Sequence, residues 1–193
     1  MSNALSRAYE SIRENDSLQL LILTATGKVF SVDKIGNSSG DSAKQLSTLT
    51  IPVLVVLNGD ATGSGLELAL AGDLRVCVPS AKFSFPGLER GAMPKDGGTQ
   101  RLPRLVGPAW AKDMLLTGRS VDANEALSIG LVNRVSEDIT ETIAELSAQI
   151  TGGSPIGVRY AKEAVGKGTD LTLEQGLRLE AVSYTHLRAH ETE

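Results

Sequence analysis

The hydrophobic residues form short continuous runs in the first half of the chain and longer stretches with helical spacing in the second half. Residues 51–57 (IPVLVVL) are apolar throughout, and a run of this length is typical of a strand that is buried on both faces. Shorter runs predict three more strands, over residues 18–24, 74–78 and 82–85.

Helical spacing is clear over residues 3–14, where the apolar residues fall on one face. Residues 108–117 show the same spacing, and we expect Trp110, Met114 and Leu115 to face the core. Further helices are predicted over residues 42–49, 122–129, 139–150 and 154–167, and one more begins at residue 172.

The order of these elements indicates the fold class. Strands concentrate early and helices late, and the two alternate in between, so the sequence predicts a layered α/β fold. The chain has 193 residues, of which 41% are hydrophobic and 22% charged, which suits one globular core.

A glycine-rich turn follows the central apolar run. Asn58-Gly59 breaks the strand, and Gly63, Ser64 and Gly65 allow the backbone to turn tightly before a helical pattern resumes at Leu66. A strand, a tight turn and a helix start leave backbone N–H groups that can bind an anion or a developing oxyanion. Glu67 lies in the first turn of the expected helix, next to this candidate site.

Three familiar loops are excluded here, because the residues that define them are missing. No Lys-Ser/Thr pair follows Gly65, as a phosphate-binding P-loop requires, and Leu68 occupies the third glycine position of a dinucleotide-binding loop. Ser64 lacks the flanking glycines of a nucleophile elbow. The alternative interpretation of Glu67 is that it merely complements the helix dipole.

Charge and cysteine content limit the partners and the compartment. The net charge is −4 with acids and bases interspersed, so neither a nucleic acid nor a membrane is expected as a partner. No apolar stretch is long enough to span a bilayer, and the first residues do not resemble a signal peptide. The single cysteine, Cys77, lies in an apolar run; we expect it to be buried, in a cytoplasmic protein.

The two histidines, His186 and His190, both lie in the last eight residues. A Ser-His or Cys-His mechanism therefore has no base in the rest of the chain, and no carboxylate cluster predicts a metal site. Acid–base chemistry falls to Asp, Glu, Lys or Tyr.

Residues 182–192 (VSYTHLRAHET) differ from the rest of the chain in composition. They resemble the translation of a sequencing-library adapter, so we expect residues 182–193 to be a non-native tail after a reading frame cut near Ala181. The alternative is a genuine terminal helix.

Four stretches together resemble the enoyl-CoA hydratase/isomerase family, or crotonase superfamily: residues 18–31, 51–76, 96–107 and 115–135. The resemblance implies a spiral of ββα units over residues 1–135 and a helical C-terminal region over residues 136–181, with the family's first strands and final helices missing. It also implies a homotrimer or a dimer of trimers. The substrate would be an acyl-CoA thioester, so coenzyme A belongs to the substrate and no separate cofactor is expected.

The family holds the thioester oxygen with two backbone N–H groups. Matching the motifs places these donors at Ser64, where the family has glycine, and at Lys34, within a stretch that differs from the family's usual Ala-Gly-Ala-Asp-Leu. The resemblance further implies that the substrate is bound along Gly63, Gly65, Gly87 and Asp96.

Hydratases of this family use two glutamates. Glu67 matches the first, but Gly87 occupies the position of the second, so hydration would rely on one carboxylate. Isomerisation of a double bond needs only one base. Glu89 and Asp96 are candidate replacements, or else solvated loop acids. The sequence thus predicts either an enoyl-CoA hydratase/isomerase-like enzyme with Glu67 as proton shuttle, or an acyl-CoA-binding homologue with little hydratase activity.

Overall fold

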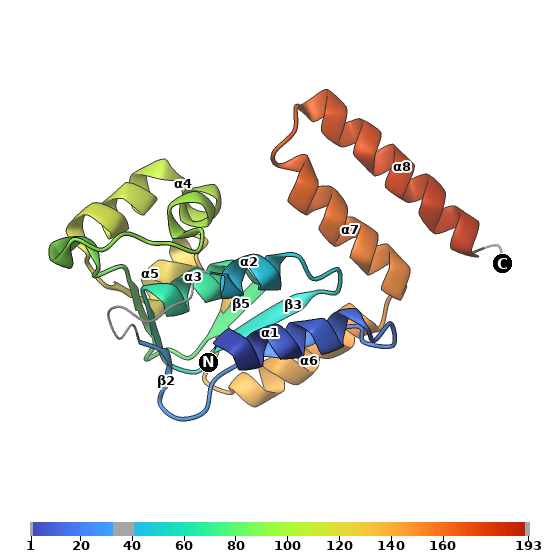
Figure 1. Ribbon diagram of the computed structural model, residues 1–193. Helices are drawn as coiled ribbons and strands as arrows, with labels where there is room; N and C mark the ends of the chain where they lie inside the picture. The colour runs from blue at the N-terminus through green and yellow to red at the C-terminus, as the bar shows by residue number, and fades with distance from the viewer. Residues whose placement is uncertain (1, 33–40, 192–193) are drawn as a thin grey trace.

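The computed structural model describes residues 2–32 and 41–191 (Figure 1). Its strands form two four-stranded sheets. The first sheet is parallel throughout and has the order β1 (Leu21–Leu23), β3 (Val53–Leu57), β5 (Leu74–Cys77), β8 (Arg134–Val135). The second has the order β2 (Val29–Ser31), β4 (Asp60–Thr62), β6 (Lys82–Ser84), β7 (Val121–Asp122), and only its β6–β7 pair is antiparallel.

Successive strand pairs divide between the two sheets, and each pair is followed by a helix. The three units are β1–β2 with α2 (Ser42–Ser47), β3–β4 with α3 (Ser64–Leu70), and β5–β6 with α4 (Gly98–Thr117). The predicted α/β spiral of ββα units is therefore confirmed. A short 3-10 helix, η1 (Leu88–Arg90), stands between β6 and α4.

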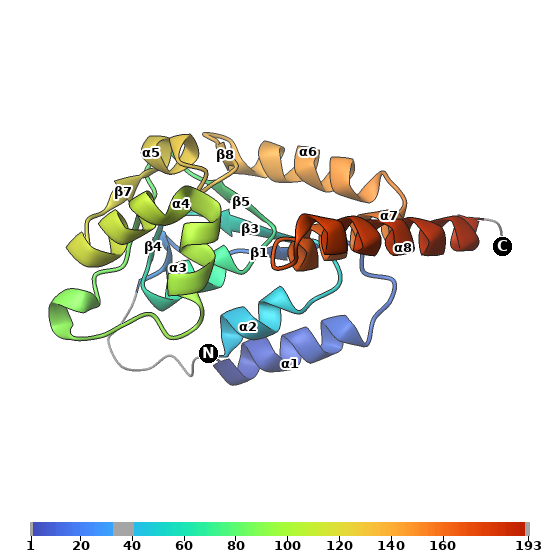
Figure 2. The same ribbon diagram turned by 90° about the horizontal axis from the view of Figure 1, so that it is seen from above.

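The continuous apolar run of β3 is explained by cover on both faces. Val53, Val55 and Leu57 join the main core, whereas Leu54 and Val56 join a second cluster with Leu146 of α6 (Ile139–Thr151). Alternate residues of a strand point to opposite faces, so each face of β3 needs apolar residues. Figure 2 shows the first sheet between α6 on one side and α1 (Ser2–Arg13) with α2 on the other.

Most predicted elements are confirmed, including the buried Cys77. The helix expected at 108–117 is the second part of α4, in which Gly107 (φ 80°, ψ 160°) interrupts the helix just before Pro108. The expectation for Trp110 is wrong: the side chain is 42% exposed, and the guanidinium of Arg119 lies 5.5 Å from the centre of its ring. Met114, by contrast, is fully buried.

Capping residues fix the helix starts in the later part of the chain. Asp122 accepts a hydrogen bond from the Glu125 amide at α5 (Ala123–Ser128), and Asp138 accepts one from the Glu141 amide at α6. Ser154 caps α7 (Pro155–Gly168) with Pro155 as the first helical residue, as predicted.

The last two helices, α7 and α8 (Leu173–Glu191), lie side by side and project from the sheets (Figure 1). None of the described residues of α7 is fully buried. Polar contacts attach it: Lys162 Nζ lies 2.7 Å from Asp73 Oδ2 and 2.8 Å from the Ile51 carbonyl oxygen. α8 continues through residues 182–191, and the adapter origin of that segment stays a prediction.

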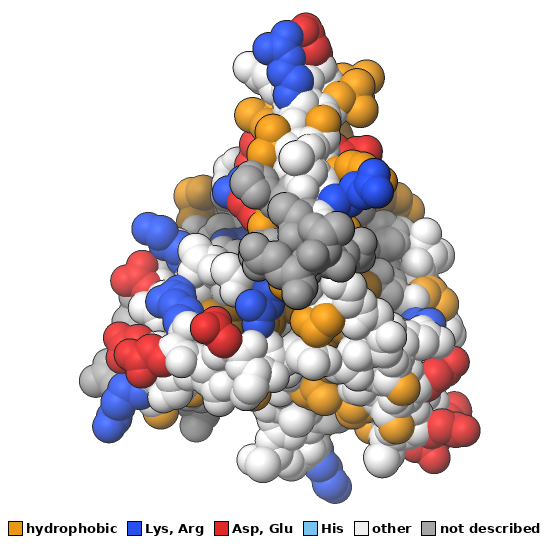
Figure 3. Space-filling view, turned by 90° about the vertical axis from the view of Figure 1, so that its right-hand side faces the viewer, with side chains coloured by type: hydrophobic (Ala, Val, Ile, Leu, Met, Phe, Trp, Pro, Cys, Tyr) orange, Lys and Arg blue, Asp and Glu red, His pale blue; other side chains and the backbone are white. Residues whose placement is uncertain are grey.

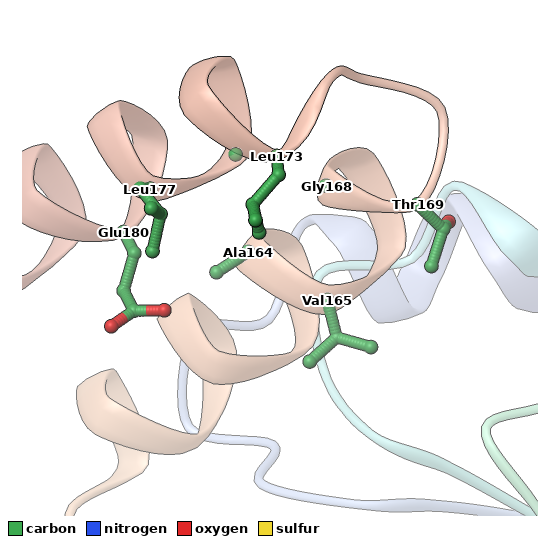
Figure 4. Close-up of a pocket in the computed structure, with 8 residues that line it drawn as sticks. Ala164, Val165, Gly168, Thr169, Leu173, Leu177 and Glu180 are labelled. Atoms are coloured by element: carbon green, nitrogen blue, oxygen red, sulfur yellow. The ribbon is translucent and has the colours of Figure 1, made fainter.

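Apolar side chains remain exposed on this pair of helices. Figure 3 shows the molecule from the right-hand side of Figure 1, and hydrophobic side chains gather there on the part that projects at the top. The exposed fraction is 69% for Val165, 80% for Leu173 and 55% for Leu177. These three residues line a shallow pocket of about 290 Å³ between the helices, with Glu180 at its edge (Figure 4). Every helix within residues 2–32 and 41–191 is too short or too polar to span a lipid bilayer.

Candidate active site

The turn after β3 is held against the connection between β1 and β2. Asn58 Nδ2 donates a hydrogen bond of 2.8 Å to the Gly27 carbonyl oxygen. A Cβ at Gly59 would lie 2.1 Å from the Lys28 carbonyl oxygen, so only glycine fits there. These contacts fix the start of the turn against residues 27–28. The strand β4 follows directly, at residues for which the sequence predicted only a turn.

The turn before α3 depends on Gly63, which has a φ of 52° and directly precedes the helix. Its N–H donates to the Ser84 carbonyl oxygen of β6 at 3.0 Å, and its carbonyl oxygen accepts from the Glu67 amide at 3.0 Å. Ser64 is the first residue of α3, and no described residue other than glycine has a positive φ. A serine at this position therefore causes no backbone strain.

Gly65 brings the end of β2 against the start of α3. A Cβ at Gly65 would lie 2.4 Å from the Cβ of Ser31 and 2.6 Å from its carbonyl oxygen. No local pattern in the sequence indicates the position of Ser31, because its contact with Gly65 joins segments more than thirty residues apart. Lys34, the second expected donor, lies outside the described residues.

Glu67 is 3% exposed and faces the start of α4. Its Oε1 accepts hydrogen bonds from the amides of Asp96 (2.7 Å) and Gly98 (2.8 Å), and its Oε2 accepts one from the Lys95 amide (3.3 Å). A carboxylate oxygen has two lone pairs, so Oε1 is fully used by these donors whereas Oε2 keeps one. This lone pair of Oε2 can accept or return a proton.

The glycine at position 98 is required by this arrangement. A Cβ at Gly98 would lie 3.0 Å from Glu67 Cγ and 3.1 Å from Glu67 Oε1. Gly98 thus lets the Glu67 carboxylate approach the first amide of α4. The sequence indicated a glycine-rich stretch here but not its partner, which lies 31 residues earlier in the chain.

The side chain of Asp96 points to a different element. Its Oδ2 accepts a hydrogen bond of 2.6 Å from the Ala43 amide, and its Oδ1 accepts one of 3.2 Å from the Lys44 amide, both in the first turn of α2. Nearby, burial and the negative charge of Asp96 raise the pKa of the Tyr9 phenol to about 12. Asp96 is thus close to Glu67 through its backbone and bound to α2 through its carboxylate.

Gly87 and Glu89 lie at the short helix η1, between β6 and α4. Gly87 precedes η1, and its Cα faces the backbone of Ala92. Glu89 is exposed, and its carboxylate lies against Gly118 at the end of α4. Among residues 2–32 and 41–191, no group of three His, Cys, Asp or Glu side chains is placed to hold a metal ion.

Known proteins resemble this chain in both sequence and fold. The family model for enoyl-CoA hydratase/isomerase matches residues 1–193. YngF of Bacillus subtilis (strain 168), which carries the name enoyl-CoA hydratase/isomerase, is 39% identical over 202 residues, covering 95% of this chain and 78% of YngF. The carnitinyl-CoA dehydratase of Salmonella arizonae is 34% identical over 194 residues, covering 92% of this chain and 74% of that enzyme.

Solved structures agree with these relatives. The crystal structure of enoyl-CoA hydratase from Bacillus anthracis has a TM-score of 0.89 at 32% sequence identity, covering 95% of this chain and 78% of that one. Sequence and fold thus match over nearly the same residues. The chain belongs to the enoyl-CoA hydratase/isomerase family, the crotonase superfamily, and is an enzyme of that family.

Proposed function

We propose that the protein acts on enoyl-CoA thioesters through an enolate held by backbone N–H groups, with Glu67 moving the proton. One observation supports this proposal most: Glu67 is a buried carboxylate whose Oε1 is occupied by two amides and whose Oε2 keeps a lone pair. A base that is fixed in orientation and excluded from water is what proton transfer between two carbons of one substrate requires.

The oxyanion would be stabilised at the start of α3. The Ser64 amide follows Gly63, whose position is fixed by the hydrogen bond to Ser84. A preorganised backbone donor stabilises negative charge as it develops on the thioester oxygen. The second donor is assigned to Lys34 by the family motif alone.

A single carboxylate favours isomerisation over hydration. In isomerisation, Glu67 would take a proton from the α-carbon of a 3-enoyl thioester, and the electron pair of that C–H bond would move toward the thioester oxygen to form a dienolate. The same carboxyl would return the proton to the γ-carbon, where the electrons of the original double bond form the new C–H bond while the dienolate electrons form the 2-enoyl double bond. Hydration also needs a group that activates water. Gly87 has no side chain to do this, and Asp96 has both oxygens bound to amides of α2.

A second candidate function is acyl-CoA binding with little turnover. Gly87 favours it, because the position that holds the second glutamate in hydratases has no room for a Cβ. The hydrogen bonds of Glu67 fit this alternative as well, since the carboxylate caps the N-terminus of α4 whether or not it transfers a proton.

Enzyme assays separate these functions. We expect turnover of a 3-enoyl-CoA to the 2-enoyl isomer that exceeds the hydration of crotonyl-CoA, and we expect Glu67→Gln to lower kcat roughly 10²–10⁴-fold. Glu145→Gln is the matched control, because Glu145 is an exposed carboxylate paired with Arg134 on the far side of the sheet. Acyl-CoA binding without turnover of either substrate would favour the second function.

We also propose a cytoplasmic protein that assembles as a homotrimer or a dimer of trimers. The exposed apolar side chains of α7 and α8 support assembly, since apolar patches of this kind are commonly covered by a partner. Light scattering of the purified protein gives the number of subunits, and a monodisperse monomer would contradict this assembly.

A further inference from the structure

Asp96 lies between α3 and α2 and contacts each with a different group. Its backbone N–H donates to Oε1 of Glu67 at 2.7 Å, and its carboxylate accepts from the amides of Ala43 and Lys44 in α2. The two sets of bonds join α3, the loop before α4, and α2.

The carboxylate of Asp96 supplies the cap that α2 otherwise lacks. Asp41 precedes α2 but makes no capping hydrogen bond with its side chain. The first amides of a helix have no partner within the helix, so they need an acceptor from elsewhere. Asp96, more than fifty residues away in sequence, fills this role for Ala43 and Lys44.

A second anchor holds the same loop. Arg101 Nη1 donates to the Asp96 carbonyl oxygen at 2.5 Å, and Arg101 Nη2 donates to Ser47 Oγ at the end of α2 at 3.2 Å. The guanidinium of Arg101 packs against Gly97, because a Cβ at residue 97 would lie only 2.3 Å from Arg101 Nη1. The loop that carries the donors to Glu67 is therefore tied to both ends of α2.

We propose that Asp96 is a positioning residue for Glu67. Its carboxylate fixes the loop of residues 95–98 on α2, and the amides of this loop fix the orientation of the Glu67 carboxylate. The inference rests on the proposed role of Glu67 in proton transfer. It also replaces the interpretation of Asp96 as a second acid–base group, because both carboxylate oxygens are directed to α2.

The test combines kinetics with amide hydrogen exchange. Asp96→Ala should lower kcat for the enoyl thioester roughly 10–100-fold with little change in KM, because a displaced proton-transfer group costs rate and not binding. It should also speed exchange at the amides of residues 96 and 98, the donors to Glu67, as well as at residues 43 and 44.

Two further variants make the result specific. Asp96→Asn keeps one acceptor for α2, so kcat and exchange should lie between the wild type and Asp96→Ala; this milder variant carries the test if the alanine variant does not fold. Asp138→Ala removes a comparable cap from α6, far from Glu67, and should leave kcat and exchange at residues 96 and 98 unchanged.

The inference is overturned if Asp96→Ala speeds exchange only at residues 43 and 44, while residues 96 and 98 stay protected and kcat is unaltered. Failure of the proposed function gives a different result, namely a wild-type protein that turns over no enoyl thioester. In that case the exchange at residues 96 and 98 still decides whether Asp96 positions Glu67.

Discussion

The Cα of Gly87 faces the backbone of Ala92 so closely that a Cβ at residue 87 would lie 2.6 Å from the Ala92 carbonyl oxygen. The Ala92 amide also donates to the Gly87 carbonyl oxygen at 2.9 Å, which closes the turn around η1. The missing second glutamate is thus accompanied by a backbone that leaves no space for any side chain. Restoring a carboxylate at this position would require the turn to move.

We therefore predict that Gly87→Ala lowers the free energy of unfolding by about 1–3 kcal/mol, because the inserted methyl group displaces the backbone of Ala92. Chemical denaturation measures this change. Gly166→Ala is the control: nothing lies within 4 Å of its Cβ position in the exposed part of α7, and it should stabilise the protein by about 0.5–1 kcal/mol. Equal stability of Gly87→Ala and wild type would show that the turn adapts without cost.

The sequence predicted the parts of the fold that follow from local pattern. The apolar run of β3 and the cap of α7 by Ser154 are examples, since each depends on neighbouring residues. β4 was missed because its three residues are defined by pairing with β2 and β6, which are distant in sequence. Trp110 was misplaced because the buried face of this part of α4 runs through Ala111 and Met114, and Trp110 lies beside that face.

In the candidate active site, too, the sequence predicted local features but not contacts between distant segments. The place of Glu67 in the first turn of a helix was predictable from the sequence. Its donors at residues 95, 96 and 98 were not, because folding brings them from a loop 28–31 residues further along the chain. The commitment of the Asp96 side chain to α2 was equally hidden, since no local pattern links residue 96 to residue 43.

Gly98→Ala should weaken catalysis more than stability. The new methyl group would lie 3.0 Å from Glu67 Cγ and 2.9 Å from Pro94 Cβ, so the glutamate must shift, whereas the backbone of residue 98 is acceptable for alanine. A shift of about 1 Å in a catalytic group can cost 10²-fold in rate. We expect kcat for the 3-enoyl thioester to fall by about 10–100-fold, and Gly166→Ala again serves as the control. An unchanged kcat would argue against a precise placement of Glu67.

Tyr9→Phe should stabilise the protein. Tyr9 is 2% exposed, and its hydroxyl has no hydrogen-bond partner among the described residues. An unpaired buried hydroxyl costs about 1–3 kcal/mol in lost hydration, so its removal should raise the free energy of unfolding by about 1 kcal/mol. Urea denaturation at neutral pH checks this. A loss of stability would mean that the hydroxyl has a partner, and Asp96 would be the first residue to examine because its charge raises the pKa of the phenol.

Cys77 should make the protein less stable as the pH rises above 9. Burial raises the pKa of its thiol from 9.0 to about 11. Between these values the thiol ionises in the unfolded chain but stays protonated in the folded one, so its contribution is complete below pH 9 and is lost as the pH approaches 11. The expected loss from pH 8 to pH 10 is about 1.4 kcal/mol.

Cys77→Ala isolates this contribution. The variant starts from a lower stability, because Cys77 is fully buried in β5 and alanine leaves a small void. Its stability should nevertheless decline less between pH 8 and pH 10 than that of the wild type, by about 1.4 kcal/mol. Comparing the two proteins at each pH under reducing conditions cancels the other titrating groups, since these are common to both. Parallel pH profiles would mean that the thiol ionises as readily in the folded chain as in the unfolded one.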